Sequence, residues 1–179
     1  GPIHATAATV DLLGVMLPDS AHIQESEARR SAKRFRGKRP MEPIYALQDA
    51  RECLTQANSV AYDQEFSPHA TVRCRFRDAG HILGSAIIEV WVTEHGRATK
   101  LVFSGDLGQP GRPILRDPTL IEETDILVVE STYGDRRHLD LAATEDEMIA
   151  IVEKTLYERG GNVIMPAFAT TIAAIAAAA

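Results

Sequence analysis

The segment Asp78-Ala79-Gly80-His81-Ile82-Leu83-Gly84-Ser85-Ala86 places a histidine in a glycine-flanked turn between two alternating stretches. Before the turn, residues 71–77 alternate between apolar and polar side chains. After it, the apolar positions of the next stretch are Ala86, Ile88, Val90 and Val92. Alternation with a period of two predicts half-buried strands. We therefore expect His81 at the end of a strand, where a rigid sheet can hold it.

A second turn of the same kind follows about twenty-five residues later. A strand over Lys100–Ser104 runs into Gly105-Asp106-Leu107-Gly108, and His95-Gly96 is expected to be the hairpin turn that precedes this strand. Each of the two glycine-containing turns thus presents one potential metal ligand, His81 in the first and Asp106 in the second.

The side chains of His81 and Asp106 suit a hydrolytic metal centre. A metal makes bound water acidic enough to act as a nucleophile at neutral pH, and two metals about 3.5–4 Å apart need a bridging group. Aspartate offers two hard oxygens for such a bridge, and histidine supplies a neutral nitrogen to zinc-like ions. Spacing alone also allows a structural interpretation, in which both are hydrogen-bonded turn residues.

The C-terminal third of the chain has the pattern of a layered α/β fold. Residues 125–130 contain four consecutive apolar residues, which predicts a strand buried on both faces that ends at the carboxylate of Glu130. Thr144 opens a helix with a capping box, and Gly160-Gly161 ends it. The inner stripe of this helix is expected to be Met148, Ile151, Val152 and Leu156. Residues 162–167 are expected to form the next strand, whereas the alanine-rich residues 173–179 support no inference.

A basic block lies near the N-terminus. Residues 29–39 hold seven of the 19 Lys and Arg residues and no acid, although the whole chain has a formal net charge of −6. Before the block, we expect a short strand at residues 3–6 and a helix that Pro18 kinks or restarts. The block itself is expected to form a loop that ends in Pro40-Met41-Glu42-Pro43. This loop either meets a polyanion or is simply solvated.

Composition is typical of a soluble globular protein. No apolar run approaches the roughly 18–20 residues of a membrane span, and the N-terminus lacks the pattern of a signal peptide. The two cysteines, Cys53 and Cys74, form no disulfide framework, so a reducing cytoplasm is the expected location. Cys74 sits in a strand pattern and is expected to be a buried structural thiol.

Four short motifs, in this order, resemble a known family. They are Asp-Ala-Gly-His-Ile-Leu-Gly-Ser-Ala from residue 78, Phe-Ser-Gly-Asp-Leu-Gly from residue 103, Glu-Ser-Thr-Tyr-Gly-Asp-Arg from residue 130 and Gly-Gly-Asn-Val-Ile-Met-Pro-Ala-Phe-Ala from residue 160. The chain resembles, over residues 1–169, the metallo-β-lactamase-fold proteins of the β-CASP group. These are RNA-processing nucleases that include the cleavage and polyadenylation factor nuclease and its prokaryotic relatives.

The resemblance implies a fold, two domains and a site. The fold would be α/β, a partial metallo-β-lactamase αββα sandwich over residues 1–142 with the start of an inserted β-CASP domain at 143–179. His81 would be a zinc ligand, Asp106 would bridge two zinc ions, and Glu130 would be an acid near the scissile phosphate. The substrate would be single-stranded RNA, and the basic block would lie near its path through Arg34, Arg36, Lys38 and Arg39. A homodimer is also compatible with the sequence.

The chain departs from the family in one respect. No His-x-His occurs in it, so the His-x-His-x-Asp-His motif that supplies most metal ligands is absent. We therefore expect an incomplete fragment that binds metal poorly and is inactive by itself. Two alternatives stay open at this stage: a non-catalytic scaffold or RNA-binding relative in a processing complex, and a small-molecule hydrolase of the same fold.

Overall fold

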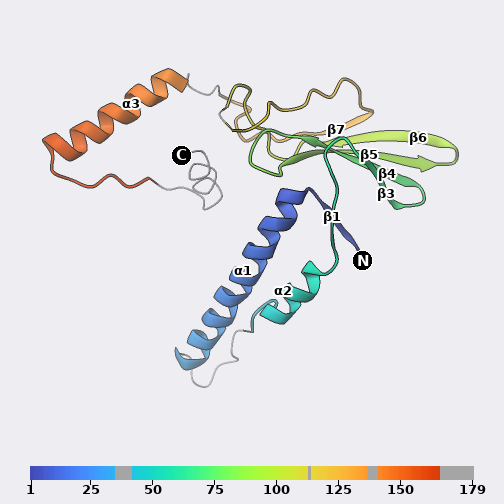
Figure 1. Cartoon of the computed structure of the whole chain (residues 1–179), viewed down its shortest axis with the longest axis horizontal. Coiled ribbons are helices and arrows are strands. Elements are labelled where there is room, and N and C mark those ends of the chain that lie inside the picture. The colour runs from blue at the N-terminus through green and yellow to red at the C-terminus, as the bar shows by residue number, and fades with distance from the viewer. Residues whose placement is uncertain (35–41, 113, 137–140, 166–179) are drawn as a thin grey trace. The chain divides into compact units, whose positions relative to one another are not determined.

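The structure is a computed structural model that describes residues 1–34, 42–112, 114–136 and 141–165. The chain divides into two compact units, Gly1–Val129 and Glu130–Ala179, and each is described by itself. The chain contains both helices and strands, so the predicted α/β class is confirmed (Figure 1). The αββα sandwich and the domain boundary after residue 142 stay predictions.

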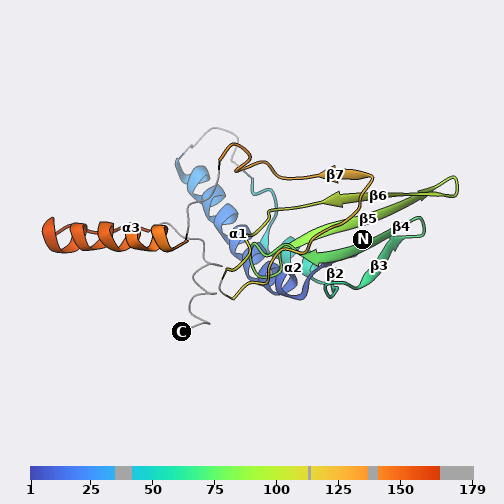
Figure 2. The ribbon, with the colours of Figure 1, turned by 90° about the horizontal axis from the view of Figure 1, so that it is seen from above.

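A five-stranded sheet dominates the first unit (Figure 2). Its order is β3-β4-β5-β6-β7, antiparallel from β3 to β6 and parallel between β6 and β7. The strands are β3 (Glu65–His69), β4 (Val72–Asp78), β5 (Ala86–Glu94), β6 (Arg97–Phe103) and β7 (Ile126–Val128). Strands β4 and β5 lie where the alternation predicted them. In β5, however, the buried residues are Ile87 and Glu89, whereas the expected apolar positions Ala86, Ile88, Val90 and Val92 are only half-buried.

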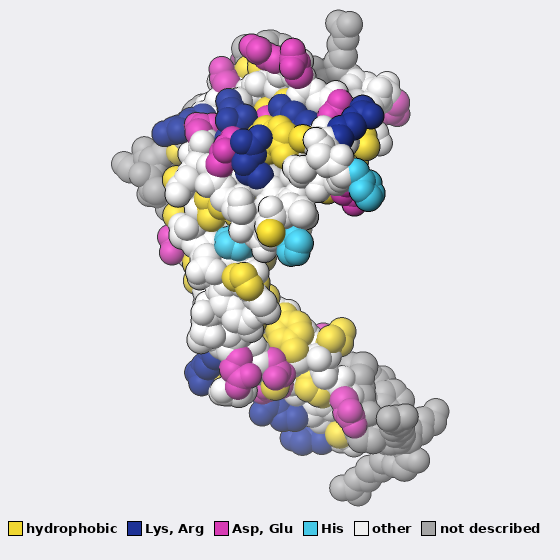
Figure 3. Space-filling view, turned by 90° about the vertical axis from the view of Figure 1, so that its right-hand side faces the viewer, with side chains coloured by type: hydrophobic (Ala, Val, Ile, Leu, Met, Phe, Trp, Pro, Cys, Tyr) yellow, Lys and Arg dark blue, Asp and Glu magenta, His cyan; other side chains and the backbone are white. Residues whose placement is uncertain are grey.

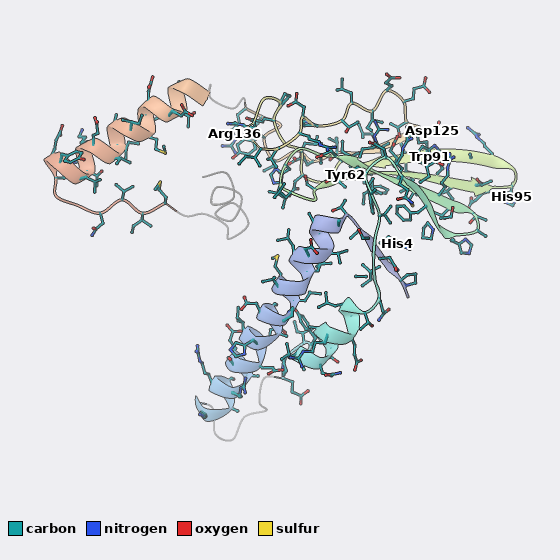
Figure 4. All side chains as sticks on the ribbon, viewed as in Figure 1. His4, Tyr62, Trp91, His95, Asp125 and Arg136 are labelled. Carbon is teal, nitrogen blue, oxygen red and sulfur yellow. The ribbon has the colours of Figure 1, made fainter. Side chains whose placement is uncertain are left out.

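Burial along β4 follows the predicted period. Cys74 and Phe76 are buried, and Phe66 of β3 packs on Phe76 with ring centroids 5.0 Å apart. Burial raises the pKa of the Cys74 thiol, as expected for a structural cysteine. The β5–β6 hairpin turns at His95 and Gly96, both with positive φ, and His95 lies at its tip (Figure 4).

The face of the sheet opposite Cys74 and Phe76 has a small core at one end and a charged cluster at the other. Ala79, Ile87 and Val102 are buried together under Leu107 and Ile121. Farther along the sheet, the carboxylate of Glu89 is only 2% exposed and accepts a hydrogen bond of 2.7 Å from Arg75. Its other oxygen lies 2.7 Å from the Lys100 ammonium.

The pKa of Glu89 reflects two opposed effects. Burial raises it, but the hydrogen bonds from Arg75 and Lys100 outweigh burial and hold the pKa below its usual value. Trp91 borders this cluster, with the guanidinium of Arg73 4.4 Å from its ring centroid. On the side of the molecule seen in Figure 3, Lys and Arg side chains are interspersed with acidic ones, and ion pairs join several of them on the sheet.

The N-terminal part of the unit contains two helices and a parallel strand pair. Strand β1 (Ile3–Ala5) pairs directly with β2 (Ala57–Ser59). In the sequence, the two strands are separated by the helices α1 (Ala7–Arg34) and α2 (Leu47–Leu54). Of the two outcomes expected at Pro18, a kink or a restart, the restart is wrong, because helix α1 continues through Pro18. It also includes residues 29–34, which we expected in a loop. Arg29 pairs with Glu25 one turn earlier at 3.5 Å, and such pairs favour helix in a charged segment.

Three expectations for the C-terminal third differ from the structure. Strand β7 is only three residues long, and Ile126, Leu127 and Val128 are 48–56% exposed instead of buried on both faces. In the second unit, helix α3 (Leu141–Glu153) begins three residues before the predicted cap and continues into a π-helical turn, Lys154–Glu158. Of the strand expected at residues 162–167, residues 162–165 form none, because a strand needs a partner along its edge and none pairs with them among the described residues. Residues 166 and 167 lie outside the described residues.

The helix stripe is likewise not buried within its own unit. Met148 and Ile151 are 50% and 53% exposed, although they line a shallow pocket with Val163 and Ile164. Among the described residues, no helix combines the length and apolar character needed to cross a membrane.

Candidate metal site at two turns

The His81 turn, residues 79–85, joins β4 to β5. The pairing of β4 with β5 ends at Asp78 and Ala86. In the turn itself, Gly80 and Gly84 take the left-handed conformation, with φ of +64° and +87°. Glycine adopts this conformation without strain, which lets the chain reverse in a short loop. The turn leaves the His81 side chain 44% exposed.

Hydrogen bonds within the turn fix its backbone. The carboxylate of Asp78 accepts from the Gly80 amide at 2.9 Å. The Ser85 hydroxyl accepts from the amides of His81 and Ile82 at 3.1 and 3.2 Å. The amide of the histidine is therefore held by a side chain of its own turn, and the imidazole is free to project from it.

The Asp106 turn, residues 104–108, follows β6. Ser104 is 4% exposed, and its amide donates to the Val128 carbonyl at 2.9 Å, which ties the start of the turn to β7. Gly105 then has a φ of +57°, and the side chain of Asp106 is 75% exposed. The turn is thus anchored at its base and presents a carboxylate that solvent can reach.

Backbone contact brings the two turns together. The Gly108 amide donates to the Ala79 carbonyl at 2.8 Å. A Cβ at Gly108 would lie 1.7 Å from the Gly80 oxygen and 2.7 Å from the His81 nitrogen. Only a residue without a side chain permits this approach. As a result, Nε2 of His81 lies 4.0 Å from Oδ2 of Asp106.

This distance allows the two side chains to share a cation. Two ligands bound to one tetrahedral zinc at about 2.0–2.2 Å would lie about 3.3–3.5 Å apart, so a small rotation of the exposed side chains would suffice. An imidazole nitrogen and a carboxylate oxygen also match the chemistry of zinc. They fill two coordination positions, and no group of three or more potential ligands occurs among the described residues. The assignment of both residues as ligands stays a prediction.

The other predicted functional residues stand outside this pair. Glu130 is the first residue of the second unit, two positions beyond β7, and is half-buried. Its catalytic role stays a prediction. Of the basic block, Arg34 is the last residue of α1. Arg36, Lys38 and Arg39 lie outside the described residues.

Sequence reasoning missed the residues that support the His81 turn from outside. At the start of α1, the hydroxyls of Thr6 and Thr9 both contact the Gly84 carbonyl. The hydroxyl of Tyr62 donates to the Ser85 carbonyl. No local pattern points to these contacts, because their partners lie 23–78 positions away in the sequence.

Comparisons with known proteins extend over nearly the whole chain. It is 34% identical over 169 residues to a protein named ribonuclease TTHA0252 from Thermus thermophilus, which covers 94% of this chain and 34% of that protein. It is 28% identical over 172 residues to the transcription termination factor FttA of Pyrococcus abyssi, covering 94% of this chain and 24% of that protein. The chain is thus similar in sequence to a protein named as a ribonuclease and to one named as a transcription termination factor.

A third relative is an RNase J-like protein from Methanocaldococcus jannaschii, 28% identical over 170 residues, with 93% of this chain and 35% of that protein covered. No protein-family model matches the chain. The relatives' names support the resemblance to RNA nucleases that the four motifs indicated. The chain spans about a quarter to a third of the length of these relatives.

Proposed function

We propose that the protein carrying this sequence is a metal-dependent hydrolase of RNA phosphodiester bonds, of the β-CASP group. The observation that carries the proposal is the approach of His81 and Asp106 to 4.0 Å at the ends of two strands. The similarity to proteins named as ribonucleases supports it. His81 and Asp106 would hold two zinc ions together with ligands from elsewhere in the whole protein.

A bound zinc pair would supply an acidic water and positive charge beside the scissile phosphate. The residues of this chain prepare that position. The Gly108–Ala79 bond keeps the two turns in register, and the exposure of both side chains leaves access for an RNA strand. Glu130 would place a proton or a water near the reacting phosphate. The basic block would contact the RNA backbone through its Lys and Arg side chains.

Cleavage of single-stranded RNA by the whole protein tests the proposal. His81→Ala and Asp106→Ala should each abolish cleavage and leave the unfolding midpoint unchanged, because both side chains are exposed. The matched controls are His22→Ala and Asp19→Ala on the exposed surface of α1, which should cleave normally. Full activity in both turn variants would remove the proposed metal site.

The same assay separates the scaffold alternative. A non-catalytic RNA-binding protein would bind single-stranded RNA but would not cleave it, with or without added zinc.

For the basic block, replacing Arg36, Lys38 and Arg39 by Gln should flatten the dependence of RNA affinity on salt concentration, since fewer counterions are released on binding. An unchanged slope would mean that the block is only solvated.

A further inference from the structure

The start of α1, with Thr6 just before the helix and Thr9 in its first turn, contacts the backbone of the His81 turn. The Gly84 carbonyl accepts hydrogen bonds from the hydroxyls of Thr6 at 2.8 Å and Thr9 at 3.1 Å. Thr6 is only 5% exposed although it is polar, and helix α1 starts beside the sheet at this point (Figure 1). Buried hydroxyls are normally hydrogen-bonded, and here the partner is the turn that carries the candidate ligand.

The contact requires that residue 84 has no side chain. A Cβ at Gly84 would lie 2.8 Å from the Thr9 hydroxyl oxygen and 2.9 Å from the Thr9 amide nitrogen. Its φ of +87° is also strained for any residue with a side chain. Glycine therefore does two things here: it reverses the chain, and it lets α1 approach the turn closely enough for both threonines to bond it.

A second support comes from the segment between β2 and β3. The Tyr62 hydroxyl, labelled in Figure 4, donates to the Ser85 carbonyl at 2.8 Å. A tyrosine phenol keeps its proton at neutral pH and can donate this bond. Burial and the charge of Asp78 raise the pKa of Tyr62 further. Because the Ser85 hydroxyl accepts from the His81 amide, Tyr62 fixes the residue that in turn fixes the histidine.

We propose that Thr6, Thr9 and Tyr62 are positioning residues for His81, holding residues 84 and 85 so that the imidazole stays beside the carboxylate of Asp106. Their relevance to metal rests on the proposed function of His81 as a ligand. An exposed side chain on a glycine-containing turn would otherwise sample many orientations, and fixing it at metal binding would cost conformational entropy. Hydroxyls that fix the turn beforehand reduce this cost.

Amide hydrogen exchange tests the mechanical part of the proposal without any metal. Thr6→Val keeps the shape of the side chain and removes its hydroxyl, whereas Thr6→Ser keeps the hydroxyl. A single such bond stabilises by an amount equivalent to about fivefold in an equilibrium constant. We expect the His81 and Ile82 amides to exchange about five times faster in Thr6→Val and in Tyr62→Phe, and at the wild-type rate in Thr6→Ser.

Matched controls remove the same groups elsewhere. Thr55→Val deletes a hydroxyl that bonds the Glu52 carbonyl at the end of α2, and Tyr45→Phe deletes one that bonds Ser20. Both should leave the His81 amide at its wild-type rate, and urea unfolding checks that each variant is folded. Unchanged exchange at His81 in both Thr6→Val and Tyr62→Phe would overturn the proposal.

Zinc affinity, measured in the whole protein by competition with a chelating dye, tests the link to the site. Thr6→Val should weaken binding several-fold and Thr6→Ser should restore it, with His81→Ala as the reference for a lost ligand. If His81→Ala itself leaves affinity unchanged, the proposed metal site has failed, and the exchange experiment still decides whether the turn is held. If His81→Ala weakens binding but Thr6→Val and Tyr62→Phe do not, the positioning role is refuted and the metal site stands.

Discussion

Replacing Gly108 by alanine tests whether the His81 and Asp106 turns really touch. The new Cβ would lie 1.7 Å from the Gly80 oxygen and 2.1 Å from the Gly80 carbonyl carbon. Real Cβ contacts are essentially never shorter than 3.0 Å, so the backbones must separate by at least about 1.3 Å, the difference between these distances. No flexible side chain can relieve this clash, because both atoms belong to the backbone.

The expected loss of stability has two parts. Forcing an extra methyl group into a packed site costs about 1–3 kcal/mol. The separation also breaks the 2.8 Å bond from the Gly108 amide to Ala79, which is fully buried, at a further cost of about 1 kcal/mol. Gly108→Ala should therefore lower the free energy of unfolding by about 2–4 kcal/mol.

Gly14→Ala is the matched control, since the same substitution should have the opposite sign there. Gly14 lies inside α1, and a Cβ at this position would meet nothing within 4 Å. Alanine in an exposed helix interior is favoured over glycine by about 0.5–1 kcal/mol. Urea unfolding of both variants followed by circular dichroism measures the difference. If Gly108→Ala unfolds at the wild-type urea midpoint, the two turns are not in backbone contact and the 4.0 Å approach of His81 to Asp106 has no support.

Three further predictions concern the sheet. Glu89→Ala should lower the free energy of unfolding by about 2–3 kcal/mol, below the 3–5 typical of a fully buried pair because its partners Arg75 and Lys100 are partly exposed. Glu65→Ala breaks an exposed pair and should cost less than about 1 kcal/mol, and equal effects in urea unfolding would contradict this reasoning. Because the folded-state pKa of Glu89 is lowered, its charge contributes stability above the unfolded value of about 4.3, and this contribution is lost as pH falls through the folded pKa. Glu89→Gln should therefore flatten the pH dependence of the unfolding free energy below about pH 4.3, and a curve parallel to that of the wild type would count against the lowered pKa. Finally, a maleimide reagent should label half-exposed Cys53 before buried Cys74 in the folded protein and both at similar rates in urea, whereas faster native labelling of Cys74 would mean that β4 is not packed as described.

Local patterns predicted the elements whose burial is decided by their immediate neighbours. The alternation around Cys74 predicted β4, and the His95-Gly96 pair predicted the hairpin tip. Patterns that depend on distant partners misled us. The apolar run at 126–129 requires cover on both faces, and the described residues leave it about half exposed. The basic block was expected in a loop, but residues 29–34 continue α1.

The candidate site shows the same division. From the sequence alone, His81 and Asp106 could be assigned to glycine-containing turns after strands, because glycine spacing and strand alternation are local properties of the chain. Only the tertiary structure decided that these turns meet, that Gly108 lies against Gly80, and that α1 and Tyr62 reach residues 84 and 85. The physical reason is that contacts between segments far apart in the sequence depend on how whole elements pack, and no periodicity within either segment records where its partner will be.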